Sequence, residues 1–238
     1  MSMSRKMALS ASAAAAALAC AGSALAQVPS NWSGPYLGAT LGYGASHFNN
    51  VYHVYELTTG TTGADNVSLS GLVGGLQAGY RAEMGSNVVL GARVGALWTG
   101  VRGSGTAISC PAAACFLNNS TTQNDQVTSA QTLQLDVGYA MGEWLPYVTA
   151  GGALGQFKGY GSVSNVFGST KFSYTKSVGG WLVGGGVERR IDPHWSVKAE
   201  YEYLNFPAFT EIAPAGAIGQ TGVKIDENLF QVGLNFQF

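Results

Sequence analysis

The chain ends on Glu227-Asn-Leu-Phe-Gln-Val-Gly-Leu-Asn-Phe-Gln-Phe238, and this stretch decides the fold. Every second residue from Phe230 to Phe238 is apolar, while the residues between them are glycine or polar. A period of two is typical of a β-strand with one apolar and one polar face. Soluble domains seldom end on an exposed aromatic strand, because chain ends fray into water. The ending therefore predicts a closing strand in an all-β protein.

The N-terminus predicts export. Arg5 and Lys6 precede an almost unbroken apolar run from residue 7 to 21, and Ala24-Leu25-Ala26 supplies a small-x-small cleavage pattern. The run is shorter than the roughly 20 residues that a membrane-spanning helix needs. We therefore predict a signal peptide over residues 1–26 and a mature domain over residues 27–238. A lipoprotein site at Cys20 is the weaker alternative, because Ala17 stands where such sites usually have Leu.

The cysteines agree with export. Cleavage would leave Cys110 and Cys115 as a pair, and a small disulfide-closed loop suits an oxidising compartment. A metal site would need further ligands nearby, and none of the three histidines is close in sequence. We predict a disulfide bond and no metal.

Composition excludes several classes of protein. The chain has 34 Gly, 11 Tyr and 10 Phe but only 11% charged residues, against about 25% in ordinary soluble domains. Its net charge is −1 without a Lys/Arg cluster, which excludes a nucleic-acid partner.

Alternation and turn signals together predict eight strands. They are residues 35–44, 68–83, 88–101, 127–139, 144–157, 176–188, 195–204 and 227–238. The connections alternate between tight turns (84–87, 140–143, 189–194) and long polar segments (45–67, 102–126, 158–175, 205–226). An even strand number with short turns on one rim and long loops on the other is typical of a closed antiparallel transmembrane β-barrel with periplasmic turns and extracellular loops.

The strand faces predict which side meets lipid. A soluble lipocalin-like barrel would turn the apolar face inward, but the polar faces here carry too few charges for a water-exposed surface. Aromatic residues also gather near strand ends, as in an interfacial girdle. The outer girdle is predicted at Trp98, Trp181, Tyr203 and Phe230, and the periplasmic girdle at Tyr80, Tyr139, Trp195 and Phe238. In the glycine-rich strands 144–157 and 176–188, alternation does not show which residues face lipid and which face the lumen.

Seven charged residues fall on the inward face: Arg81, Arg93, Asp136, Glu188, Lys198, Glu200 and Glu202. Charges taken from bulk water need partners, so a paired polar network that fills the lumen is the favoured interpretation. The alternative is a selectivity lining for a pore. Eight-stranded barrels hold little more than their own side chains, although the many inward glycines would loosen that filling.

The order of the short motifs resembles a known family. Asn31-Trp32-Ser33-Gly34-Pro35-Tyr36-Leu37-Gly38, the stretch from Lys198 to Tyr203 and the terminal Phe resemble small porin-like or opacity-like surface antigens of alphaproteobacteria, within the eight-stranded OmpA-type barrel superfamily. The resemblance implies localisation in the outer membrane after Sec-type export. It also implies that the terminal strand is a signal for the barrel-assembly machinery, carried by Phe230, Val232, Leu234, Phe236 and Phe238.

The predicted function is structural and surface-directed: a monomer among outer-membrane lipids and lipopolysaccharide that serves envelope integrity, adhesion or contact with host or surface ligands. No hydrolase elbow, zinc-protease motif or P-loop is present, so neither catalysis nor a cofactor is expected. A narrow channel for ions or small solutes is the first alternative. The second is a loop-based haem binder that uses His47 and His53.

Overall fold

The computed structural model describes residues 31–54, 61–107, 120–165, 168–211 and 219–238. Within these residues the chain forms nine strands: β1 (Gly34–Val54), β2 (Thr61–Glu83), β3 (Val88–Thr99), β4 (Arg102–Ala107), β5 (Ser120–Tyr139), β6 (Trp144–Asn165), β7 (Gly168–Arg190), β8 (Trp195–Glu211) and β9 (Gly219–Gln237). A search of the same residues for a helix long and apolar enough to cross a bilayer finds none.

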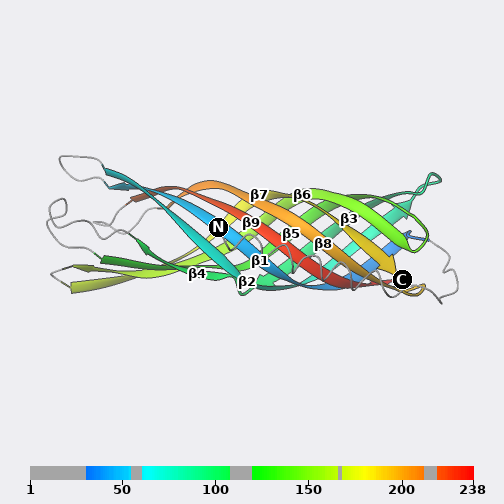
Figure 1. The fold of residues 1–238 in the computed structure, drawn as a ribbon, viewed down its shortest axis with the longest axis horizontal. Coiled ribbons are helices and arrows are strands. Elements are labelled where there is room, and N and C mark those ends of the chain that lie inside the picture. The colour runs from blue at the N-terminus through cyan, green and yellow to red at the C-terminus, as the bar shows by residue number, and fades with distance from the viewer. Residues whose placement is uncertain (1–30, 55–60, 108–119, 166–167, 212–218) are drawn as a thin grey trace, which may run out of the picture.

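The strands close into one antiparallel barrel, elongated along its axis and crossed obliquely by every strand (Figure 1). Strands that are neighbours in sequence pair with each other, except β3 and β4, and β1 pairs with β9 in one register from Tyr36↔Gln237 to Asn49↔Lys224. The predicted closure of the first strand against the last is therefore confirmed. Closure leaves no free sheet edge in the wall, as a bilayer requires.

The strands β3 and β4 occupy one position in the wall, between β2 and β5, so the barrel has eight strand positions. The break between them falls at Gly100 and Val101. Gly100 N donates to Leu72 O, and the Val101 side chain turns into the lumen, where it is fully buried. Here the wall approaches Gly71 so closely that a Cβ at that position would lie 2.5 Å from Gly100 O.

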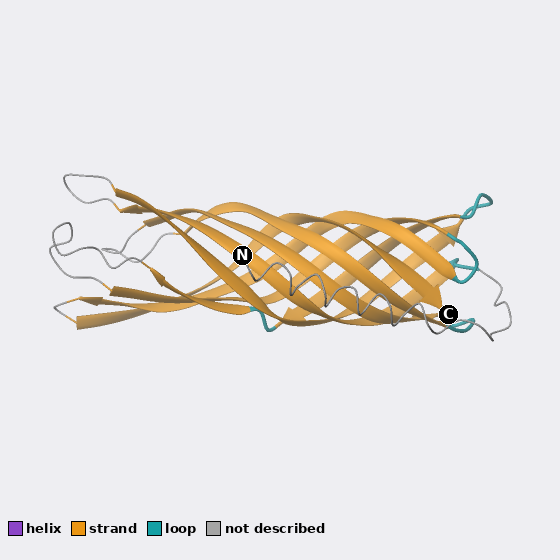
Figure 2. Ribbon diagram, viewed as in Figure 1, coloured by secondary structure: helices purple, strands orange, loops and turns teal. Residues whose placement is uncertain are grey.

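Three described connections gather at one end of the barrel (Figure 2). Residues 84–87, 140–143 and 191–194 form tight turns at what we call the turn end, beside the C-terminus. Asn87 and Gly142 take positive φ angles of 63°, which a tight turn often requires. In the third turn the backbone N–H groups of His194 and Trp195 donate to Asp192, which lowers the pKa of that carboxyl.

The opposite end, which we call the extended end, corrects the predicted strand limits. β1 was predicted to end at Gly44 and runs to Val54, while β7 was predicted to begin at Lys176 and begins at Gly168. These extensions pair through regular ladders up to Val54↔Thr61 and Asn165↔Gly168. Their polar residues carry no apolar period, because neither face packs against lipid there, so alternation could not reveal them.

Outward faces agree with the predicted lipid side. The side chains of Leu72, Leu76, Leu133, Leu135, Phe230 and Val232 are between 54% and 68% exposed. The predicted outer girdle has exposed Trp98, Trp181 and Phe230, and Trp181 lies 5.7 Å from the ring of Tyr203. The parity left open is now resolved: Tyr147 and Leu182 face inward, whereas Val148 and Trp181 face outward.

Candidate functional site in the barrel lumen

The lumen is filled in three layers. The first, at the turn end, is a cap made of Trp32, Val89, Ala140 and Leu145. Trp32 is fully buried, its backbone N donates to Glu83 Oε2 at 2.9 Å and its indole N donates to Gly142 O at 3.3 Å. These bonds hold the segment that precedes β1 across the turn-end mouth.

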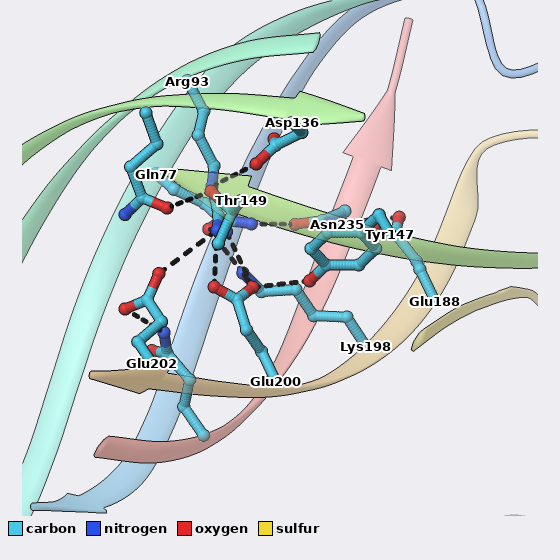
Figure 3. A network of polar contacts seen from close by, with 12 residues as sticks. Gln77, Arg93, Asp136, Tyr147, Thr149, Glu188, Lys198, Glu200, Glu202 and Asn235 are labelled. Carbon is cyan, nitrogen blue, oxygen red and sulfur yellow. Dashed lines mark hydrogen bonds and ion pairs between the residues drawn. The ribbon is translucent and has the colours of Figure 1, made fainter. Parts of the chain in front are cut away.

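The second layer is a charge network, and Figure 3 shows its central part. Arg81 lies where the network meets the cap, 5.9 Å from the centre of the Trp32 ring. Its guanidinium binds Glu188 through two hydrogen bonds of 2.9 and 2.6 Å, and it stacks 4.2 Å from the ring centre of Tyr36. Ser196 and Asn235 also donate to Glu188. A bidentate Arg–carboxylate pair with further donors is the arrangement that compensates best for removing a charge from water.

Arg93 forms the centre of the network. It donates to Glu200 at 2.8 and 2.5 Å and to Glu202 at 3.2 Å. Its Nε lies 3.3 Å from Asp136 Oδ1 without hydrogen-bond geometry, so that contact is a purely electrostatic one. Lys198 donates to Glu200 at 2.6 Å. One residue from β3 thus joins carboxylates of β5 and β8 across the lumen.

Uncharged side chains connect the Arg81–Glu188 pair to the groups around Arg93. Gln77 donates to Asn235 at 2.6 Å, Asn235 donates to Glu188, and Lys198 donates to Gln77. Tyr147 donates to Glu200 at 2.5 Å, and Gln231 donates to Glu202 at 3.0 Å. Hydrogen bonds and ion pairs therefore join the ionic groups into one continuous network. It leaves little room: the lumen cavity lined by Gln77, Arg93 and Glu202 has a volume of about 10 Å³, enough for about one water molecule.

The third layer, toward the extended end, is an apolar plug. It consists of Leu69, Val73, Leu97, Val101, Val127, Ala130, Ala153, Phe157, Val178, Leu182, Leu204, Phe206, Ile225 and Leu229. The rings of Phe157 and Phe206 meet edge to face at 5.2 Å. Phe206 packs so close to the wall that a Cβ on Gly180 would lie 2.6 Å from its ring.

The whole described chain matches one family, the outer membrane protein beta-barrel domain, over residues 12–238. The chain belongs to this family. It is an outer-membrane protein, and the resemblance read from the sequence is confirmed at this level. In this family's orientation the turn end faces the periplasm and the extended end faces the outside.

Similar proteins include a 31 kDa outer-membrane immunogenic protein from Brucella melitensis biotype 1, which is 28% identical over 211 residues that cover 87% of this chain and 84% of the relative. Neisserial surface protein A is 16% identical, with 87% and 98% coverage and a TM-score of 0.40. The outer membrane protease OmpT from Escherichia coli is 11% identical, with 90% and 99% coverage and a TM-score of 0.48. The two solved structures are similar in fold alone.

All seven charged residues predicted to face inward lie in the lumen of this family member, and each takes part in an ion pair. The sequence analysis missed their uncharged partners Gln77, Tyr147, Gln231 and Asn235, as well as Arg190, which is buried at the periplasmic mouth and lies 4.5 Å from the Trp32 ring centre. A period of two could have found Gln77, Gln231 and Asn235, which share the inward parity of their strands, but not Tyr147, whose strand had no clear parity.

The remaining predicted sites lie elsewhere. Cys110 and Cys115, with the predicted disulfide, and the predicted signal peptide fall outside the described residues. His47 and His53 belong to β1 rather than to a loop. They stand six residues apart on one strand, about 20 Å, which is too far for both to bind one iron atom. Among the described residues no group of three or more His, Cys, Asp or Glu could hold a metal ion.

Proposed function

We propose that this protein is a closed, non-catalytic barrel whose role is to anchor and display the extracellular strand extensions, for envelope integrity, adhesion or host contact. The observation that carries the proposal is the continuous filling of the lumen by the cap, the charge network and the apolar plug. A barrel filled in this way provides a rigid support and no route for solutes.

The charge network favours this role over a selectivity lining. A pore that selects ions presents charges to water, whereas Arg93, Glu188, Lys198 and Glu200 are at most 4% exposed and are bound to one another or to amides. Opening the lumen would break several charge-assisted hydrogen bonds at once, each worth roughly 1.5–3 kcal/mol.

The strand extensions supply the displayed surface. β1, β6 and β7 continue beyond the outer girdle as paired ladders, so their outward residues are held in a regular sheet outside the membrane. The Brucella relative is named an outer-membrane immunogenic protein, and we extend that property to these extensions.

Planar-bilayer recording tests the closed lumen. We expect the refolded mature protein to insert without unitary conductance steps. A variant with Phe157→Ala and Phe206→Ala, which empties the centre of the plug, serves as a comparison, and heat-modifiable migration confirms that both barrels are folded. Regular conductance steps from the unmodified protein would overturn the proposal in favour of the channel.

A further inference from the structure

A trough runs along the lipid-facing surface of β5, β6 and β7. Its volume is about 560 Å³, and its main lining residues are Leu133, Gly152, Leu154, Gly179, Trp181 and Pro207. The strand register explains its shape, because Gly152 pairs with both Leu133 and Trp181, and Gly179 pairs with Leu154. Each outward glycine therefore leaves a space between large apolar side chains.

The trough lies at the outer edge of the hydrocarbon region. Trp181 belongs to the outer girdle, where aromatic side chains mark the membrane interface. Beyond the trough, the next outward residues on the three strands are Ser129, Gln156 and Ser177, which share one row of the sheet. A guest in the trough is consequently an acyl chain of the outer leaflet.

Two cationic side chains lie on the extracellular side of the trough. Arg102, Gln126 and Lys158 form one row across β4, β5 and β6, and both charged side chains are exposed. Two strand spacings separate them, about 10 Å, and Lys158 lies four residues beyond Leu154 along β6, about 13 Å. Lys171 of β7 adds a third exposed cation farther out.

This face is cationic where its side chains are described. Among the side chains of β4 to β7 that the structure describes, the acidic ones, Asp136 and Glu188, face the lumen. Neither Arg102 nor Lys158 has an ion-pair partner among the described residues. Guanidinium and ammonium groups side by side suit phosphate, which an arginine can bind through two parallel hydrogen bonds.

We propose that this face is a binding site for one lipopolysaccharide molecule of the outer leaflet. One acyl chain fills the trough between Leu133, Leu154 and Trp181, while phosphates of the sugar head bind Arg102 and Lys158. The trough thus contacts the apolar part of the amphiphile, and the two cations contact its anionic part. The proposal goes beyond the display role and does not depend on it.

Native mass spectrometry of the full mature barrel, titrated with bisphosphorylated lipid A, tests the site. Removing both charges (Arg102→Gln with Lys158→Gln) should weaken binding about thirtyfold, from roughly 1 kcal/mol for each cation near an anionic surface. Filling the trough (Gly152→Leu with Gly179→Leu) should weaken it about tenfold or more. The wall tolerates these side chains, since a Cβ meets no atom closer than 3.9 Å at Gly152 and 3.8 Å at Gly179.

Matched controls isolate the face. Ala39→Leu makes a similar enlargement at an exposed outward position on β1, which lies four wall positions from β6 in either direction. Arg189→Gln removes a cation at the periplasmic end. Both should bind lipid A as the unmodified barrel does. Lipid A without phosphates should bind the unmodified barrel and the charge variant equally.

Competition on the unmodified barrel needs no variant. We expect lipid A to displace phosphatidylglycerol from the protein. Equal binding of the two lipids would show a general preference for anionic lipids and would overturn the proposal. Unchanged lipid A affinity in either the charge variant or the trough variant would do the same.

Discussion

At the scale of single residues, Arg93 explains how the lumen tolerates its charges. It joins β3 to Glu200 and Glu202 on β8, to Asp136 on β5 and to Gln77 on β2. Such a buried network adds little net stability compared with an apolar filling, because desolvation offsets most of the attraction. Its effect is asymmetric, since removing one partner leaves the others buried and unpaired.

We therefore expect Arg93→Gln to lower the free energy of unfolding by about 3–5 kcal/mol. Lys198 would remain as the cation that contacts Glu200. Urea unfolding of the barrel in lipid vesicles, followed by tryptophan fluorescence, measures the change. Arg189→Gln removes a more exposed pair, at 3.4 Å from Glu143, and should cost less than about 1 kcal/mol. Equal losses in the two variants would contradict the central role of Arg93.

At the scale of elements, the terminal strand is a case in which apolar and polar alternation predicted the strand faces correctly. Its apolar parity faces lipid as expected, with Phe238 65% exposed and its ring 5.1 Å from that of Phe236. Alternation gives no signal in β6 and β7, because the glycines at 151, 152 and 184–186 have no side chains to distinguish the two faces. It also missed the apolar plug, because inward apolar residues such as Phe157 and Leu182 interrupt the alternation between lipid and polar lumen.

Deletion of Phe238 tests the predicted assembly signal. We expect lower levels of the protein in the outer membrane and aggregated or degraded chain in the periplasm, because the strand loses its lipid-facing end. Fractionation followed by gel migration with and without heating reports the folded barrel. Replacing Phe238 with Tyr keeps an aromatic end and should assemble normally. Full levels of heat-modifiable barrel after the deletion would disprove the signal.

At the scale of the whole molecule, the topology was predictable and the shape of its outer half was not. Connection lengths distinguished the two rims, and turn residues such as Gly142 marked the periplasmic one. The length of the extensions depends on backbone pairing between segments such as Tyr160 and Ser173, which leaves no mark in composition. Only the charged members of the network could be predicted from the sequence. Its uncharged members, such as Gln77 and Asn235, resemble the other polar residues on the inward faces.

Cysteine labelling tests this orientation. In a background with Cys110→Ser and Cys115→Ser, we expect Ser173→Cys on the β7 extension to react in intact cells with a maleimide too large for the outer membrane. Ser86→Cys in the first tight turn should react only after lysis. Both positions are exposed, so only the membrane distinguishes them. Equal labelling, or the reverse pattern, would invalidate the assigned topology.

The cap has a consequence for the order of folding. Trp32 bonds to Glu83 and to Gly142, which are 51 and 110 residues away in sequence. The strand that follows it pairs with the opposite end of the chain. Contacts so distant in sequence form slowly, because loop-closure entropy is lost before they form. The first described residues of the chain are therefore among the last to reach their native positions, and the seating of Trp32 reports completion of the barrel.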